Sequence, residues 1–136
     1  MIQTFQATPE NSPELNELGM PIGKRCNEDW EISPRETKRL FESGEIVLID
    51  CRSDAEYDAV RIVGVELFPL DDLGSMVDEL DERRGKRIVI HCHTGVRSLK
   101  AAAFLRAQGF DDARSMAGGI DLWSIDVDTS VPRYTK

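Results

Sequence analysis

Short apolar runs alternate with segments of helical periodicity along most of this chain. Residues 46–49 and 87–91 are rich in Ile and Val and have the length of buried strands, because parallel strands covered on both faces are apolar at successive positions. Residues 98–108 instead place apolar side chains three or four positions apart, which is typical of a helix. The same criteria predict further strands at 65–68 and 113–116, and further helical segments at 34–43, 53–58 and 73–83.

This alternation favours an α/β domain of three layers, α/β/α, with a mainly parallel central sheet. Turn and cap residues mark several of the boundaries. Ser33 and Pro34 are typical of an N-cap and a first helical position, and Glu36 is placed to complete a capping box. Gly118-Gly119 is interpreted as a turn.

The length of 136 residues is that of one ordinary domain. Residues 1–29 lack periodicity and are predicted to form an irregular N-terminal arm, followed by the α/β domain at 30–136. No apolar stretch approaches the length of a membrane span, and the first residues lack the basic and apolar regions of a signal peptide. Three cysteines without the spacing of a disulfide framework fit a reducing compartment. We therefore expect a cytoplasmic protein with no membrane association.

The net charge of −8 argues against a nucleic-acid partner, but the charge is unevenly distributed. Acidic residues concentrate at 41–85, whereas the last third of the chain has an excess of Lys and Arg. The acidic middle is interpreted as a solvated face. The basic third would attract a small anion, over a range that salt limits to roughly 8–10 Å.

Cys92 lies in that basic third, where the strand at 87–91 gives way to the helix at 98–108. Backbone N–H groups at a helix start lack intrahelical partners, and the helix dipole adds partial positive charge, so both lower the pKa of a thiol. Arg97 adds a permanent cation with a planar set of donors. We therefore interpret Cys92 as a nucleophile, although an isolated cysteine is more often an inert, buried thiol.

Two other chemistries, metal binding and phosphate-ester hydrolysis, are less compatible with this loop. His91, Cys92 and His93 do not suit a metal ion, because side chains at adjacent positions of a strand end point to opposite faces. Cysteine phosphatases have a similar loop with one more residue between the cysteine and the arginine. Four residues separate Cys92 from Arg97 here. The shorter loop suits a smaller anionic group, such as the outer sulfur of a persulfide held by backbone N–H donors.

Several short motifs accompany the Cys92 loop. They are Asp50-Cys51-Arg52 with Glu56-Tyr57, then Gly64-Val65, and finally Gly118-Gly119-Ile120 with Trp123. With these motifs the chain, from about Trp30 to about Trp123, resembles the single-domain rhodaneses, or rhodanese-like sulfurtransferases. Three positions depart from the family pattern: Val60-Arg61-Ile62 replaces a usual Gly-His-Ile, and Cys51 replaces a usual valine.

The resemblance implies a sulfurtransferase. The Cys92 thiolate would take the outer sulfur of a small donor such as thiosulfate, and the persulfide would pass it to a thiol, to cyanide or to a sulfur-carrier protein. Arg97 would stabilise the reacting anion. The substrate-binding residues would be the rest of the loop, His93, Thr94, Gly95, Val96 and Ser98. No metal or cofactor is implied.

Two rival functions remain open at this point. One is a non-catalytic, protein-binding rhodanese-like module, and the other is a cysteine phosphatase or arsenate reductase. The tail at 124–134 is similar to the end of rhodanese domains fused to enzymes that activate sulfur carriers, which suggests a carrier protein as acceptor. Cys51 is interpreted as a buried, valine-like thiol, with the alternative that it comes within disulfide reach of Cys92.

Overall fold

The computed structural model describes residues 13–22, 27–83 and 85–135, which form an α/β domain around a five-stranded parallel sheet. The strand order is β1-β5-β4-β2-β3. The strands are β1 (Glu31–Ile32), β2 (Ile46–Asp50), β3 (Glu66–Leu67), β4 (Arg87–His91) and β5 (Arg114–Met116). The predicted fold class is therefore confirmed, and its central pair, β2 and β4, consists of the two apolar runs that predicted buried strands.

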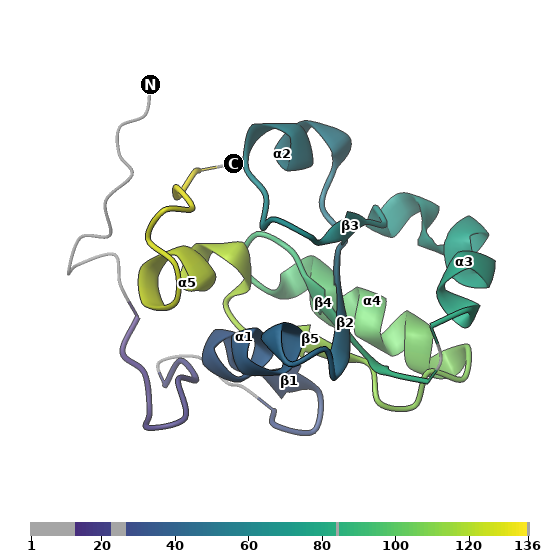
Figure 1. Ribbon diagram of the computed structural model, residues 1–136, viewed down its shortest axis with the longest axis horizontal. Helices are drawn as coiled ribbons and strands as arrows, with labels where there is room; N and C mark the ends of the chain where they lie inside the picture. The colour runs from purple at the N-terminus through teal and green to yellow at the C-terminus, as the bar shows by residue number, and fades with distance from the viewer. Residues whose placement is uncertain (1–12, 23–26, 84, 136) are drawn as a thin grey trace.

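Helices cover both faces of this sheet (Figure 1). On one face α1 (Pro34–Glu42) packs against α5 (Gly119–Asp126). The other face carries α4 (Val96–Ala107), with the 3-10 helix η2 (Leu70–Met76) and α3 (Val77–Asp81) beside it. The short helix α2 (Asp54–Ala59) lies near the carboxyl end of β2 (Figure 1).

The side chains of β2 and β4 are divided between the two faces. Ile49, Ile88 and Ile90 belong to the apolar cluster under α4, whereas Leu48 and Val89 belong to the cluster under α1 and α5. All five are almost fully buried. Because both faces are covered, these strands are apolar without alternation, as the sequence pattern predicts.

β2 and β4 pair in register along their whole length, and the last pair is Asp50 opposite His91. One further ladder bond follows, from the Cys51 N–H to the His91 carbonyl at 3.0 Å. The carboxyl ends of parallel strands meet at the same edge of a sheet. The ends of β2 and β4 therefore bring Cys51 and Cys92 to adjacent positions.

Helix starts agree only in part with the sequence pattern. The Ser33 hydroxyl accepts a hydrogen bond from the Glu36 N–H at 3.1 Å and so caps α1, as predicted. The Glu36 carboxylate binds Arg39 instead of closing the predicted capping box. A complete capping box forms at the start of α2, between Ser53 and Glu56.

The continuous helix predicted at 73–83 is wrong. The chain forms η2 from Leu70 in the tighter 3-10 geometry, and α3 follows only from Val77 to Asp81. Gly74, within the predicted helix, has a low helix propensity, which disfavours one regular α-helix across this segment.

The sequence pattern does not predict β1 or α5. β1 has only two residues, and its pairing with β5 is a long-range contact without a local signal. The segment Gly118-Gly119 does turn the chain, with φ values of 75° and 62°, but it also opens α5. Ile120, Leu122 and Trp123 of α5 are buried, so packing rather than periodicity specifies this helix.

Part of the predicted N-terminal arm lies among the described residues. Residues 13–22 form turns closed by a bridge between Leu15 and Pro21, and Met20 is buried. Residues 1–12 and 23–26 lie outside the described residues, so the boundary near residue 30 stays a prediction. Within the described ranges, the helices are too short or too polar to cross a membrane.

Candidate active site

Cys92 is the first residue after β4, and α4 begins at Val96, earlier than predicted. Gly95 is the N-cap of α4 and has a φ of 106°, in the left-handed region that favours glycine. A Cβ at this position would also lie 3.2 Å from the backbone nitrogen of Gly118. The predicted strand-to-helix loop is confirmed, and glycine is required for its shape.

The N-terminus of α5 holds the backbone of this loop. The N–H of Ile120 donates to the Cys92 carbonyl at 2.8 Å, and the N–H of Asp121 donates to the His93 carbonyl at 3.0 Å. Gly119 packs so closely that a Cβ there would lie 2.4 Å from the His93 carbonyl oxygen. The Gly-Gly segment therefore lets α5 approach and fix the loop that carries Cys92.

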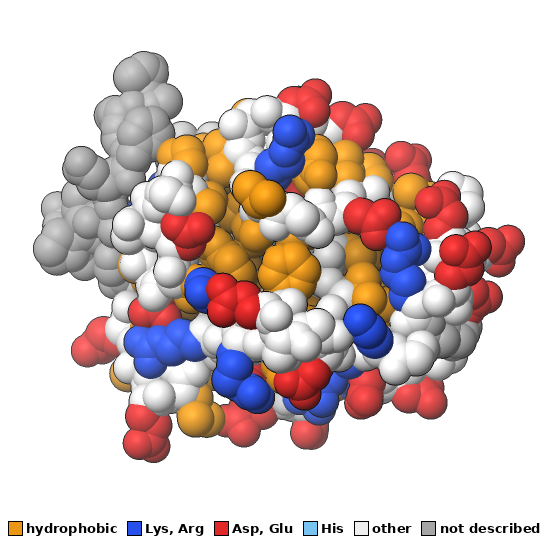
Figure 2. Space-filling view, viewed as in Figure 1, with side chains coloured by type: hydrophobic (Ala, Val, Ile, Leu, Met, Phe, Trp, Pro, Cys, Tyr) orange, Lys and Arg blue, Asp and Glu red, His pale blue; other side chains and the backbone are white. Residues whose placement is uncertain are grey.

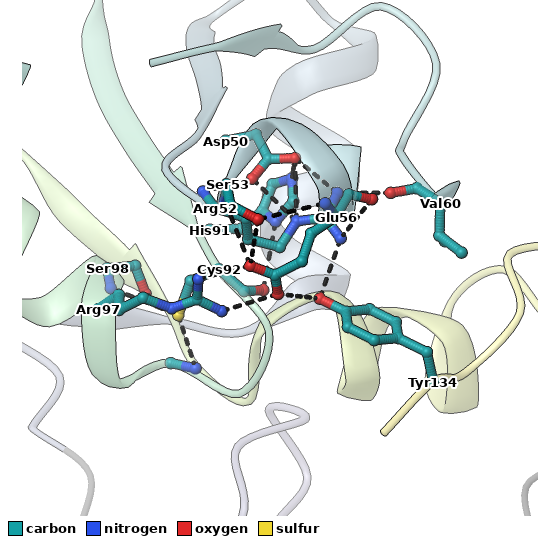
Figure 3. Close-up of polar contacts among 11 residues, drawn as sticks. Asp50, Arg52, Ser53, Glu56, Val60, His91, Cys92, Arg97, Ser98 and Tyr134 are labelled. Carbon is teal, nitrogen blue, oxygen red and sulfur yellow. Dashed lines mark hydrogen bonds and ion pairs between the residues drawn. The ribbon is translucent and has the colours of Figure 1, made fainter. Parts of the chain in front are cut away.

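Hydrogen-bond donors from the start of α4 surround the Cys92 sulfur (Figure 3). Its Sγ accepts from the N–H of Gly95 at 3.1 Å and from the N–H of Ser98 at 3.4 Å. The Ser98 hydroxyl lies 3.4 Å from the same sulfur and 2.6 Å from the Ser115 hydroxyl of β5. The buried hydroxyl pair fixes a polar group against Cys92, a residue that is 1% exposed.

These donors favour the thiolate. The pKa of Cys92 is lowered to about 4, and the largest cause is a hydrogen bond from the Cys51 thiol. The hydroxyl and N–H of Ser98 and the N–H of Gly95 act in the same direction, whereas burial acts against them. Cys92 is therefore ionised at neutral pH, as expected of a nucleophilic cysteine.

The Cys51 thiol lies beside the Cys92 sulfur. Cys51 follows β2 at the position opposite Cys92, and both side chains belong to the cluster under α4. The hydrogen bond to Cys92, and then burial, raise the pKa of Cys51 far above its ordinary range, so it stays protonated. The predicted burial is confirmed, and its position opposite Cys92 in the same apolar cluster makes Cys51 part of the site.

Arg97 is held by Glu56 of α2. Its guanidinium donates to both carboxylate oxygens, at 2.7 and 3.0 Å, and the Tyr134 hydroxyl donates to the same carboxylate at 2.7 Å (Figure 3). Burial raises the pKa of Glu56, but the hydrogen bonds from Arg97 and Tyr134 outweigh it and hold that pKa well below its usual range. The same pair raises the pKa of Arg97. Arg97 is thus a fixed, permanently charged group beside the loop.

Tyr134 brings the C-terminal tail onto the site. Its ring stacks on His93 with centroids 4.1 Å apart, and its carbonyl lies 2.9 Å from His93 Nε2. Its hydroxyl also accepts from Arg52 at 3.0 Å. His93, predicted as a substrate-binding residue, is therefore half-buried and occupied in holding the tail.

A buried ion pair lies at the carboxyl end of β2, on either side of Cys51 in the sequence. Arg52 binds the Asp50 carboxylate through Nε and Nη2, and neither side chain is exposed. His91 lies 3.6 Å from the same carboxylate. Burial is the main cause that lowers the pKa of His91, which stays neutral. His91 and His93 thus face different surroundings, Asp50 for His91 and Tyr134 for His93.

The remaining loop residues differ in exposure. Thr94 and Val96 are exposed, whereas Gly95 and Ser98 are buried beside the sulfur.

Sequence reasoning missed the roles of three residues, although it had noted two of them within motifs. These are Glu56, in the Glu-Tyr motif, Tyr134, in the tail, and Ser115, for which the sequence holds no signal.

A groove elsewhere on the surface does not locate this site. A groove of about 430 Å³ lies between α1, the segment after α2 and the tail, and it is lined by Phe41, Arg61 and Trp123 among others. Figure 2 shows apolar side chains in the middle of this face of the molecule. Neither Cys92 nor any residue of its loop lines the groove. Among the described residues, no three His, Cys, Asp or Glu side chains are arranged to hold a metal ion.

Comparison with known proteins agrees with this geometry. The model of the rhodanese-like domain matches residues 33–126. The probable adenylyltransferase/sulfurtransferase MoeZ of Mycobacterium tuberculosis is 35% identical over 104 residues, which are 76% of this chain and 26% of that protein. A tRNA uridine(34) hydroxylase of Cytophaga hutchinsonii is 32% identical over 98 residues, 70% of this chain and 31% of that protein.

Among solved structures, the human single-domain sulfurtransferase TSTD1 has a TM-score of 0.61 and 27% identity, and the match covers 71% of this chain and 96% of that one. The chain spans about a third or less of the two curated relatives above. The family match, in contrast, covers most of this chain and includes the Cys92 loop, Glu56 and the Gly-Gly segment. The chain belongs to the rhodanese-like domain family.

Proposed function

We propose that this protein is a rhodanese-type sulfurtransferase that carries a sulfane sulfur as a Cys92 persulfide. The observation that supports it best is the Cys92 thiolate, with a pKa of about 4, held by N–H donors at the start of α4. Its donor is thiosulfate or a similar small anion with a terminal sulfur. The acceptor is a thiol, cyanide or a sulfur-carrier protein.

Sulfur transfer proceeds in two half-reactions. The Cys92 thiolate first attacks the outer sulfur of thiosulfate, the sulfur–sulfur bond of the donor breaks, and sulfite leaves with the electron pair. An acceptor thiolate or cyanide then attacks the outer sulfur of the persulfide, and Cys92 leaves as the thiolate. Because the enzyme alternates between two forms, we expect ping-pong kinetics.

The loop and Arg97 supply electrostatic stabilisation in this scheme. Backbone N–H groups of residues 93–98, of which those of Gly95 and Ser98 already point at the Cys92 sulfur, would surround the outer sulfur, and fixed donors of this kind need no rearrangement during the reaction. Arg97, oriented by Glu56, faces the donor anion at the mouth of the loop. Thr94 and Val96 are exposed there and contact the acceptor.

The acceptor class is suggested by a relative. MoeZ is named as a probable adenylyltransferase and sulfurtransferase, and this chain matches 26% of its length. A sulfur-carrier protein as acceptor is therefore part of the proposal. We also place the protein in the cytoplasm, because Cys51 and Cys92 are free thiols.

The two rival functions are less well supported. A non-catalytic binding module has no use for an ionised, buried cysteine with dedicated donors. A phosphatase or arsenate reductase would need a wider loop than the four residues between Cys92 and Arg97.

Intact-mass spectrometry tests the proposal. Incubation with thiosulfate should add one sulfur, about 32 Da, which peptide mapping places on Cys92 and which cyanide removes as thiocyanate. A Cys92→Ser variant is the control and should gain nothing. A parallel assay with phosphate esters should show no turnover. Hydrolysis of the esters without any sulfur adduct would overturn the assignment in favour of a phosphatase.

A further inference from the structure

Two buried thiols meet at the carboxyl ends of β2 and β4, and the scheme above uses only one of them. The register that ends with Asp50 opposite His91 places Cys51 opposite Cys92 at the next position. Neighbouring strands lie about 4.8 Å apart, so side chains that leave adjacent positions on the same face are neighbours. Both side chains are 1% exposed and belong to one apolar cluster.

We propose that the Cys51 S–H group donates a hydrogen bond to Cys92 Sγ throughout the reaction, and that it stabilises Cys92 as the leaving thiolate when the persulfide is discharged. This inference rests on the proposed sulfur transfer and assigns it a further residue. Cys51 acts on the inner sulfur only. It does not take up the transferred sulfur.

The arrangement of donors supports this role. The N–H groups of Gly95 and Ser98 and the Ser98 hydroxyl all approach Cys92 Sγ from α4. Cys51 approaches from the neighbouring strand. A valine at that position would offer the sulfur only methyl groups, so the thiol adds a donor on the side of the sheet.

The discharge step balances without an oxidant or reductant. The acceptor thiolate attacks the outer sulfur, and the bond between that sulfur and Cys92 Sγ breaks. The electron pair of the broken bond stays on Sγ, and Cys51 keeps its proton while it donates to the new thiolate. A stabilised thiolate leaves faster, but it is also a weaker nucleophile in the loading step. Cys51 therefore favours release of sulfur over its uptake.

Other charged groups around Cys92 are left in place by a substitution of Cys51. Arg97 of α4 is paired with Glu56 of α2, and the Asp50 carboxylate at the end of β2 is paired with Arg52. His91 of β4 is buried and neutral. His93 and Tyr134 bind each other. A changed pH profile in a Cys51 variant can then be attributed to the missing S–H donor.

The experiment compares Cys51→Val, which fills the space without a donor, with Cys51→Ser, which restores one. Ile49→Val, in the same cluster, controls for loosened packing. Alkylation of Cys92 is followed against pH, and loading by thiosulfate and discharge by cyanide are measured in separate single turnovers. Cys51→Val should raise the pH midpoint of Cys92 alkylation and slow the discharge of the persulfide about 3–10-fold. The rate of loading, once divided by the fraction of Cys92 present as thiolate, should not fall. Cys51→Ser should recover most of both effects, and Ile49→Val should change neither.

Three outcomes would overturn the inference. Wild-type behaviour of Cys51→Val in both assays would leave Cys51 as packing only. Equal losses in Cys51→Val and Cys51→Ser would point to disturbed packing instead of a lost donor. A Cys51–Cys92 disulfide with release of hydrosulfide, found by non-reducing peptide mapping after loading, would make Cys51 a nucleophile. If the wild-type protein takes up no sulfur, the proposed function fails, and the alkylation midpoints still decide whether Cys51 is a donor.

Discussion

The chemistry of single residues in this site depends on keeping one negative charge in a buried place. Burial of Cys92 removes the water that would solvate a thiolate and by itself raises the pKa. Hydrogen bonds from Cys51, Ser98 and Gly95 outweigh this cost. Since a hydrogen bond to a charged group contributes about 1.5–3 kcal/mol, the loss of any one of them should be visible in a titration.

Alkylation against pH should show a midpoint for Cys92 far below the value of about 8.5 for a free cysteine. The thiolate is the reactive form, so the rate falls as the pH is lowered through the pKa of about 4. Ser98→Ala removes the hydroxyl and keeps the N–H, and it should raise the midpoint by about one to two pH units. Thr37→Val, which removes a fully buried hydroxyl from α1 on the other face of the sheet, is the matched control. A wild-type midpoint at or above the free value would contradict the activation of this thiol.

Substitution of Arg97 should reduce turnover more than it reduces stability. Arg97→Ala removes the cation that the proposed mechanism places against the donor, and kcat/KM should fall about 10–1,000-fold. Glu56→Gln breaks the same ion pair but keeps the cation. Its kcat/KM should therefore fall less than that of Arg97→Ala, and mainly through a higher KM. Steady-state kinetics with thiosulfate and cyanide separate the two, and circular dichroism checks the fold. Equal losses in both variants would assign the effect to the ion pair instead of the cation.

At the scale of elements, the site is a loop clamped between two helix starts. α4 supplies donors to the Cys92 sulfur, and the first N–H groups of α5 bind the carbonyls of Cys92 and His93. Gly119 makes the second contact possible, because its left-handed φ and the lack of a Cβ allow α5 to approach the loop. The position of the nucleophile therefore depends on a glycine far from it in sequence.

Gly119→Ala should destabilise the fold and displace the loop. A left-handed residue with a side chain costs roughly 1–2 kcal/mol, and the clash with the His93 carbonyl adds about 1–3 kcal/mol. Urea unfolding should show the loss, and the rate of persulfide formation should fall with it. Gly85→Ala is the control, because nothing lies within 4 Å of its Cβ and its φ is not in the left-handed region. A wild-type rate and midpoint for Gly119→Ala would show that the close approach is not required.

The same elements show what the sequence can and cannot predict. The strands β2 and β4, the loop and Cys92 follow from local pattern, because burial on both faces leaves a continuous apolar run. α5 does not, since Gly118-Gly119 has the local signature of a turn and the helix is specified by packing. The pairing of Arg97 with Glu56 and the contact between Ser98 and Ser115 join residues far apart in the sequence. Periodicity carries no information about them.

At the scale of the whole molecule, the acidic side chains of the surface and the charged groups of the candidate site are arranged differently. Figure 2 shows acidic side chains gathered at the end where Figure 1 places α3. The charged groups of the site are paired instead, Arg97 with Glu56 and Arg52 with Asp50. We therefore infer that the loop N–H groups and Arg97, rather than a broad basic surface, recognise the donor.

The C-terminal tail packs against the core and also contacts residues of the candidate active site. Val131 is buried in the cluster under α1 and α5, and its carbonyl accepts a hydrogen bond from the Ser124 hydroxyl. Arg133 then binds Asp121, in the first turn of α5, at 2.8 Å. Tyr134 reaches Glu56 and His93. The tail thus crosses from the core to the active site.

Removal of residues 132–136 should leave the fold in place and weaken both stability and activity. Val131 and the two core clusters are retained, but the Arg133–Asp121 ion pair and the contacts of Tyr134 are lost. The free energy of unfolding should fall by about 1–3 kcal/mol, and kcat/KM should fall because Glu56 and His93 lose a partner. Tyr134→Phe keeps the ring on His93 and removes only the hydroxyl. Its free energy of unfolding should fall by about 1 kcal/mol, and its kcat/KM should fall less than that of the truncated protein. Urea unfolding and the thiosulfate:cyanide assay measure both quantities. If the truncated protein matches the wild type in both, the tail is a passive end of the chain and does not support the site.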